Sequence, residues 1–143
     1  MQFISRFFFP LFVLTMLYLL ISGNLLSSSP LVIAIQVLAL ALGIWARRTF
    51  QAGQFSTGAE TKEGQLLMNG PYKFIRHPIY TTVLTLVWSS VIGHPSLITF
   101  IISLAMTVVT VIRIATEEQF LRARYQGYSD YSRATKRIVP FIF

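Results

Sequence analysis

Two short clusters of ionisable and aromatic residues stand out from a sequence that is otherwise mostly apolar. The first contains Arg76, His77 and Tyr80, at the start of an apolar run. Pro78 suits the first position of a helix, because its missing N–H has no helical partner there, and this places His77 at the cap with Arg76 just outside. A helix that opens with a cation, an imidazole and free backbone N–H groups favours a carboxylate or another anion. The first cluster is therefore a candidate anion site.

The second cluster lies at the end of the last apolar run. Arg113 and Glu117 are four residues apart, so they share a face if the helix continues, and Glu118 follows directly. Placing ionisable groups at the end of a membrane helix costs free energy. Their presence there therefore indicates a functional role, in which each charge has a partner group. The alternative is structural, with Arg113 paired to Glu117. Arg76 would pair in the same way with Glu118 and lock the two segments together. The residues alone leave both interpretations open.

The composition predicts that lipid covers much of this chain. Of 143 residues, 54% are hydrophobic and 12% are charged, so too few charges exist to build a water-facing shell around one domain. We therefore expect a single integral membrane domain over residues 1–143, with the lipid bilayer as its partner. The absence of cysteine excludes disulfides and thiolate nucleophiles, and two histidines are too few for a histidine-built metal site. No metal is expected.

Four apolar runs free of acidic residues are expected to form transmembrane helices in an all-α, polytopic fold: Phe7–Leu26, Leu31–Ala46, Ile79–Gly93 and Leu97–Ala115. The middle two have 16 and 15 residues. A span needs about 20 residues, so these two runs should borrow flanking positions. Phe7, Phe8 and Phe9 are expected to face lipid.

The charges predict the orientation of these helices. The connections at residues 22–30 and 93–96 carry no charged residue, whereas all 12 Lys and Arg lie before the first run, within residues 47–76, or from Arg113 onward. The positive-inside rule places those three segments in the cytoplasm, so we expect a multi-pass protein with cytoplasmic N and C termini. Nucleic acid is not an expected partner, because the basic residues follow membrane exits rather than covering a soluble module.

Both clusters together carry a family resemblance. Gly-Pro-Tyr-x-x-x-Arg-His-Pro-x-Tyr at residues 70–80, followed one helical hairpin later by Arg-x-x-x-Glu-Glu at 113–118, resembles the isoprenylcysteine carboxyl methyltransferase and phospholipid methyltransferase superfamily. The resemblance covers residues 43–143. Members are membrane-embedded enzymes that transfer a methyl group from S-adenosyl-L-methionine. The resemblance therefore implies S-adenosyl-L-methionine as the cofactor. It also implies a cytoplasmic cofactor pocket built from the middle loop and the C-terminal segment.

The resemblance also implies site residues. The family's cofactor contacts fall on Gln65, Leu66, Leu67, Tyr72, His77, Pro78, Ile79, Tyr80 and Glu117. Arg76 is added because the helix opening could take the cofactor's carboxylate, and Glu118 because the glutamate pair suits ribose hydroxyls or an ammonium group. In the carboxyl methyltransferase branch, the arginine four residues before the glutamate contacts the substrate carboxylate, which here is Arg113. Arg113 and Glu117 are thus the expected catalytic residues, and a carboxylate on a lipophilic or lipid-borne acceptor is favoured.

A departure at one position, two alternative functions and a possible homo-oligomer accompany this resemblance. Thr82 stands where the family commonly has glycine, and should crowd either the cofactor or a neighbouring helix. One alternative is a sterol-reductase-like membrane oxidoreductase that uses NADPH, although the two glutamates suit a 2′-phosphate poorly. Another is a membrane scaffold of the same fold without turnover. Because four spans make a minimal bundle, a second subunit in a homo-oligomer could complete the substrate groove.

Overall fold

The computed structural model describes residues 7–49 and 66–138, and the structural statements below concern these residues. They form five α-helices and one short 3-10 helix: α2 (Phe8–Ile21), α3 (Pro30–Thr49), η1 (Gly70–Lys73), α4 (Pro78–Gly93), α5 (Leu97–Arg124) and α6 (Tyr128–Ala134). The described part contains no strand, although one isolated parallel bridge joins Ile75 to Lys136. The all-α class expected from the sequence is confirmed.

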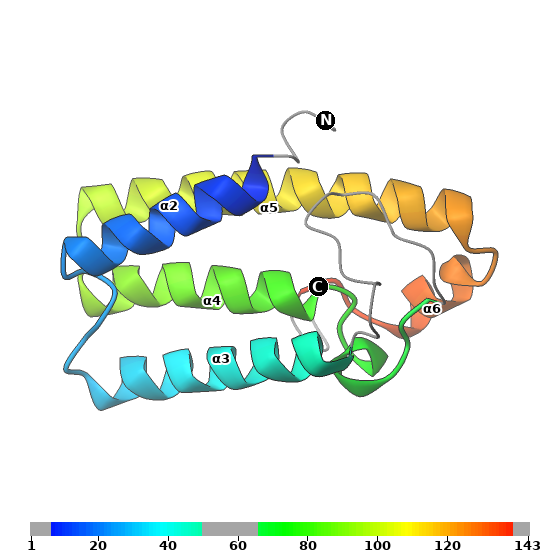
Figure 1. The fold of residues 1–143 in the computed structure, drawn as a ribbon, viewed down its shortest axis with the longest axis horizontal. Helices are drawn as coiled ribbons and strands as arrows, with labels where there is room; N and C mark the ends of the chain where they lie inside the picture. Colours follow the sequence, from blue (N-terminus) through cyan, green and yellow to red (C-terminus); the bar gives the residue numbers. More distant parts are fainter. Residues whose placement is uncertain (1–6, 50–65, 139–143) are drawn as a thin grey trace.

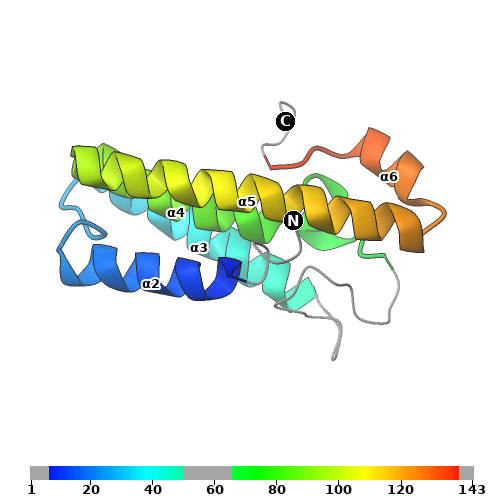
Figure 2. The ribbon, with the colours of Figure 1, turned by 90° about the horizontal axis from the view of Figure 1, so that it is seen from above.

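The four long helices run antiparallel to their chain neighbours (Figure 1). α4 lies between α3 and α5, and α2 packs on α5; the perpendicular view shows the same arrangement (Figure 2). The two uncharged connections, residues 22–29 and 94–96, meet at one end of the bundle, where His94 Nε2 lies 2.7 Å from the carbonyl oxygen of Leu26. The opposite end carries η1, α6 and the last turns of α5. Both short connections therefore share one end, as the charge distribution predicted.

α2 is shorter than the first apolar run. It ends at Ile21 rather than Leu26, because the chain turns at Gly23, whose φ of 71° is a conformation that favours glycine. The N–H of Asn24 then returns to the carbonyl of Leu19 across 2.8 Å. This is the Schellman pattern that ends many helices.

α3 and α5 are longer than the apolar runs within them. α3 has 20 residues and borrows both Pro30 and its basic C-terminal turn, whereas α4 gains only Pro78 and has 16 residues. α5 continues from Leu97 to Arg124 over 28 residues, so the last apolar run and the cluster of Arg113, Glu117 and Glu118 lie on one continuous helix. Among the described helices, α3 and α5 are long and apolar enough to cross a membrane. α2 and α4 are shorter apolar helices, and the four-span topology stays a prediction.

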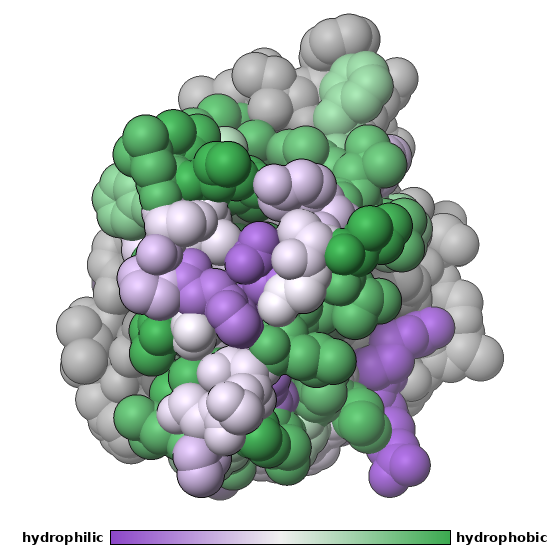
Figure 3. All heavy atoms as spheres, turned by 90° about the vertical axis from the view of Figure 1, so that its left-hand side faces the viewer, coloured by the Kyte–Doolittle hydropathy of each residue, from purple (hydrophilic) through white to green (hydrophobic). Residues whose placement is uncertain are grey.

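Apolar side chains cover the outside of the bundle, and polar side chains lie within it. Leu14, Leu38 and Ile101 are exposed. The buried amide of Gln36, in contrast, donates a 2.9 Å hydrogen bond to the hydroxyl of Ser89. The surface of the end that carries the short connections is polar near its centre and mostly apolar toward its sides (Figure 3). This pattern is typical of a bundle surrounded by lipid, where small polar residues mediate helix contacts.

Thr82 faces α3 where α3 and α4 pack against each other. Its hydroxyl donates to the carbonyl of Ala39 across 3.0 Å, and a Cβ placed on Gly43 would lie 3.0 Å from its Cγ2. The crowding expected at this position therefore falls on the neighbouring helix. The missing side chain of Gly43 makes room for the threonine.

Candidate functional site

The segment before α4 pairs with the end of the described chain. The N–H of Arg76 donates to the carbonyl of Lys136 across 2.7 Å, and the N–H of His77 donates to that of Arg137 across 3.0 Å. The hydroxyl of Thr81 then donates to the carbonyl of Ile138 across 2.7 Å. The C-terminal segment, residues 128–138, thus lies against the beginning of α4, where His77 is the N-cap residue and Pro78 the first helical residue, as predicted.

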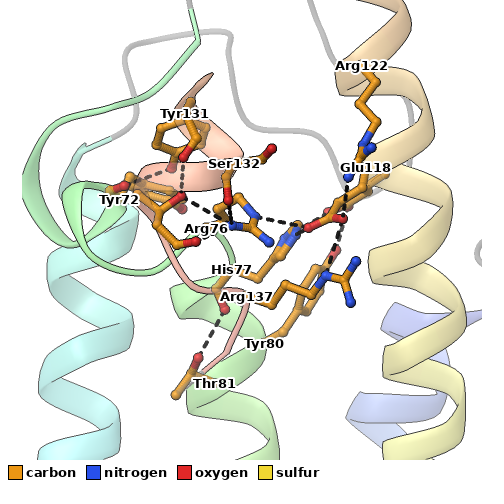
Figure 4. A network of polar contacts seen from close by, with 12 residues as sticks. Tyr72, Arg76, His77, Tyr80, Thr81, Glu118, Arg122, Tyr131, Ser132 and Arg137 are labelled. Carbon is orange, nitrogen blue, oxygen red and sulfur yellow. Dashed lines mark hydrogen bonds and ion pairs between the residues drawn. The ribbon is translucent and has the colours of Figure 1, made fainter. Parts of the chain in front are cut away.

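Arg76 joins three parts of the chain at this end. Its buried Nε donates to Oε1 of Glu118 across 3.0 Å, which confirms the ion pair considered from the sequence. Its Nη1 donates to the carbonyl of Ser132 across 2.8 Å and to that of Thr135. These contacts connect the segment before α4, the end of α5 and the C-terminal segment (Figure 4).

Glu118 is surrounded by basic groups although it is 5% exposed. Besides Arg76, its Oε1 lies 3.4 Å from Nε2 of His77. Its other oxygen, Oε2, lies 3.3 Å from Arg137 and 3.9 Å from Arg122. One carboxylate therefore holds three guanidinium groups that come from three segments.

Glu117 has different partners and remains 18% exposed. The hydroxyl of Tyr80 donates to its Oε1 across 2.5 Å, and Nη2 of Arg113 lies 3.3 Å from the same oxygen. Nδ1 of His77 lies 3.8 Å from Oε2. The Arg113–Glu117 pair considered from the sequence is confirmed, and the imidazole of His77 sits between the two glutamates.

α2 also contributes to this end of the bundle. The ring of Phe8 packs edge-on against Tyr80 with a centroid separation of 5.1 Å, and the guanidinium carbon of Arg113 lies 5.0 Å from the Phe8 centroid. Nε of Arg113 donates to the hydroxyl of Tyr80. The expectation that Phe8 faces lipid is wrong, because Phe8 is buried and its ring packs against Tyr80 and the cation of Arg113.

A set of buried tyrosines supports the C-terminal segment. The hydroxyl of Tyr131 donates to the carbonyl of Tyr72 in η1 across 2.7 Å. Burial raises the pKa of Tyr72 and Tyr131 above the ordinary range, and it raises the pKa of Tyr128 to about 12. All three phenols are therefore neutral at physiological pH. Sequence reasoning assigned no site to Tyr128 or Tyr131; the spacing of three residues was a signal that they share a helix face.

The structure brings most of the predicted site residues to one end of the bundle. The residues in mutual contact there are Arg76, His77, Tyr80, Arg113, Glu117 and Glu118. Leu66 and Leu67 are half-buried ahead of η1, Tyr72 is buried within it, and Ile79 lies in the first turn of α4. Gln65 lies outside the described residues. In residues 7–49 and 66–138, no group of three or more His, Cys, Asp or Glu could hold a metal ion.

Two features of the cluster leave capacity for a polar ligand. Within the described residues, the buried Nε2 of His77 has no hydrogen-bond partner, since its approach to Glu118 lacks hydrogen-bond geometry. Glu117 keeps part of its carboxylate exposed. Buried imidazole nitrogens normally have a hydrogen-bond partner, so a ligand could supply the one that is missing here. The imidazole of His77 and the carboxylate of Glu117 together fit a ligand that carries hydroxyl, ammonium or carboxylate groups.

Comparison with known proteins gives the family. A curated protein similar to this chain is the cobalt-zinc-cadmium resistance protein CzcN of Cupriavidus metallidurans, which is 26% identical over 113 residues. The match covers 78% of this chain and 50% of CzcN, so the chain spans about half the length of that relative. No solved structure matches. The family model of phospholipid methyltransferases matches residues 30–127, which is more than half of the chain and includes both clusters, and the protein therefore belongs to the phospholipid methyltransferase family.

Proposed function

We propose that this chain is a membrane methyltransferase that uses S-adenosyl-L-methionine and methylates a lipophilic or lipid-borne acceptor at the cytoplasmic face. Membership of the family supports methyl transfer in a membrane. The observation that carries the finer proposal is the pairing of the partly exposed Glu117 with the buried His77 at the end of an apolar helix.

The position of Glu117 along α5 suits a reaction between a water-soluble cofactor and a lipid-borne acceptor. At 1.5 Å per residue, Glu117 lies about 30 Å from Leu97, which equals the thickness of a bilayer hydrocarbon core. If α5 enters the membrane at Leu97, Glu117 lies at the boundary between hydrocarbon and headgroups. Both reactants can reach that level.

Each residue of the cluster would have a different role in binding the cofactor. The cofactor supplies a methyl group made electrophilic by its sulfonium. Glu117 would accept hydrogen bonds from its hydroxyl or ammonium groups, and His77 would use Nε2 toward it. Tyr80 would orient Glu117 through the hydrogen bond already present. Further proposed contacts are Gln65, Leu66, Leu67, Tyr72, Pro78 and Ile79.

Arg76 and Glu118 would act on the cofactor indirectly. Arg76 contacts Glu118 and two carbonyl groups of the C-terminal segment. Glu118 is nearly inaccessible. We therefore assign both a positioning role, in which they hold His77 between the segment before α4 and the end of α5.

The acceptor we propose is a carboxylate. It needs no general base, since opposite charges meet and neutralise as the methyl group moves, so the protein has to align the reactants and exclude water. Arg113 would attract it. Because Arg113 is already bound to Glu117 and Tyr80, an acceptor carboxylate would have to share this guanidinium with them.

Other functions have less support. The family that matches is one of methyltransferases, which does not favour an NADPH-dependent oxidoreductase. The name of CzcN concerns metal resistance of that relative, and the described residues here hold no candidate metal cluster. A scaffold without turnover is distinguished by experiment.

The test is binding of S-adenosylhomocysteine to the purified full chain in detergent, measured by calorimetry, followed by transfer of a labelled methyl group to a lipid extract. His77→Ala should weaken binding at least tenfold. His94→Ala, a matched change at the opposite end of the bundle, should leave binding unchanged. Wild-type protein that binds no S-adenosylhomocysteine would overturn the proposal, and binding without methyl transfer to any lipid would favour the scaffold.

A further inference from the structure

Phe8 brings α2 into contact with the charged cluster. It is the first residue of α2 and is 5% exposed, whereas its neighbours Phe7 and Phe9 are 53% and 49% exposed. Its ring is buried in one apolar core with Tyr80 of α4 and Ile114 of α5. An aliphatic side chain of similar size could also fill this core, so the contacts made by the ring itself show whether Phe8 has a further role.

The guanidinium of Arg113 lies against two aromatic rings. Its central carbon is 5.0 Å from the centroid of Phe8 and 5.8 Å from that of Tyr80. Both distances are within the ~6 Å at which an aromatic ring attracts a cation. The two rings meet edge-on, with a centroid separation of 5.1 Å. Because Arg113 is almost completely buried, water screens this attraction little, and the rings help to fix where the guanidinium lies.

An aromatic ring and a carboxylate act differently on a cation. Glu117 attracts Arg113 and also neutralises it, so this ion pair carries no net charge. Phe8 attracts the same guanidinium through its ring and adds no negative charge. A guanidinium that is held partly by rings therefore keeps more of its attraction for a second anion. Such an arrangement suits a cation that Glu117 would share with an acceptor carboxylate.

We propose that Phe8 is a positioning residue, whose ring holds Arg113 in the orientation that receives the acceptor carboxylate. This assignment rests on the proposed function. α2 would then complete the acceptor site, although it lies before residues 30–127, which the family model matches. The hydroxyl of Tyr80 is bound to Glu117, so the cofactor residues should keep their arrangement without the Phe8 ring.

The experiment measures two quantities on the purified full chain. One is the rate of labelled methyl transfer to a limiting amount of host lipid extract with saturating S-adenosyl-L-methionine, and the other is S-adenosylhomocysteine affinity by calorimetry. Phe8→Leu removes the ring but keeps an apolar side chain, so transfer should fall about tenfold while affinity changes by less than about twofold. Phe8→Tyr keeps the ring and should retain most of the transfer. Phe8→Met fills the space flexibly and gives the same test as Phe8→Leu if leucine packs poorly.

Phe12→Leu is the matched control. Phe12 lies one turn further along α2, and its ring stacks on that of Phe8 with a centroid separation of 6.5 Å. Its replacement removes a ring from the same helix and should leave transfer and affinity close to those of wild type. An equal loss of transfer in Phe12→Leu and Phe8→Leu would overturn the proposal.

A double variant shows whether Phe8 acts through Arg113. In the Arg113→Leu background, Phe8→Leu should lower transfer no further, because the cation that the ring positions is gone. Equal fractional losses in both backgrounds, or equal losses of transfer and affinity in Phe8→Leu, would overturn the proposal. Wild-type protein that transfers no methyl group would overturn the proposed function and the role of Phe8 with it. An active wild type that tolerates Phe8→Leu would reject the role of Phe8 alone.

Discussion

Arg76 and Glu118 lie 42 residues apart in the sequence, yet Nε of Arg76 donates a 3.0 Å hydrogen bond to Oε1 of Glu118. Both side chains are almost completely buried. Nη1 of Arg76 donates to backbone carbonyls of the C-terminal segment, so one guanidinium connects three segments. Because a buried cation is costly without its partner, these segments should depend on one another for their position.

Replacement of Glu118 by glutamine tests this dependence. Glu118→Gln removes the negative charge that Arg76 faces, and loss of one partner of a buried ion pair typically costs about 3–5 kcal/mol. We expect a lower unfolding midpoint in detergent and faster proteolysis within residues 128–138. Asp130→Asn changes the net charge equally at an exposed position and should alter neither. Equal stability of Glu118→Gln and Asp130→Asn would show that the ion pair does not hold the segments together.

The contact between α3 and α4 gives a second prediction. Gly43→Ala places a methyl group 3.0 Å from Cγ2 of Thr82, and such overpacking costs about 1–3 kcal/mol. Thr82→Ala removes the opposing atoms, so Gly43→Ala should cost less in the Thr82→Ala background. A double-mutant cycle of unfolding free energies measures this coupling. Gly127→Ala, where a methyl group meets open space, is the control. Strictly additive effects would contradict the packing described for this contact.

Much of the fold and part of the site could be predicted because the signals are local. Pro78 fixed the beginning of α4, and the spacing of four residues placed Arg113 beside Glu117. The Arg76–Glu118 pair could be considered because so few opposite charges were available at this end. The end of α2 was less predictable, since apolar composition continues past Gly23 and the turn depends on its backbone conformation.

Contacts made by the backbone were not visible in the sequence. The bridge between residues 74–77 and 136–137 uses N–H and carbonyl groups, which every residue has, so no side-chain pattern announces it. The burial of Phe8 was missed for a related reason: three consecutive phenylalanines look alike, and the packing of α2 on α5 decides which of them meets Arg113. Both features depend on the tertiary arrangement rather than on local propensity.

The third prediction concerns membrane topology. The chain has no cysteine, so single cysteines at the exposed positions Ser28 and Ser129 can be labelled without background. The bundle places them at opposite ends (Figure 1). A membrane-impermeant thiol reagent should reach Ser129→Cys only from the cytoplasmic side and Ser28→Cys only from the other side. Labelling of both from the same side would exclude the four-span model.

The last prediction asks whether Arg113 holds the acceptor or serves Glu117 alone. Arg113→Leu removes one partner of Glu117 but leaves Tyr80 and His77 in place, so S-adenosylhomocysteine affinity should fall by about tenfold at most, or ~1.4 kcal/mol. If Arg113 also attracts an acceptor carboxylate, turnover should fall by roughly 30-fold beyond that, because losing a desolvated charge partner costs about 2–5 kcal/mol.

Two further variants make the comparison decisive. Arg113→Lys should recover part of the turnover, since it restores the charge without the planar guanidinium. Tyr80→Phe removes the hydroxyl that connects Arg113 to Glu117, and should lower cofactor affinity and turnover by equal factors, because Tyr80 has no proposed contact with the acceptor. Binding by calorimetry and transfer of a labelled methyl group supply both quantities. If Arg113→Leu also lowers affinity and turnover by equal factors, Arg113 positions Glu117, and the acceptor must be held by other residues.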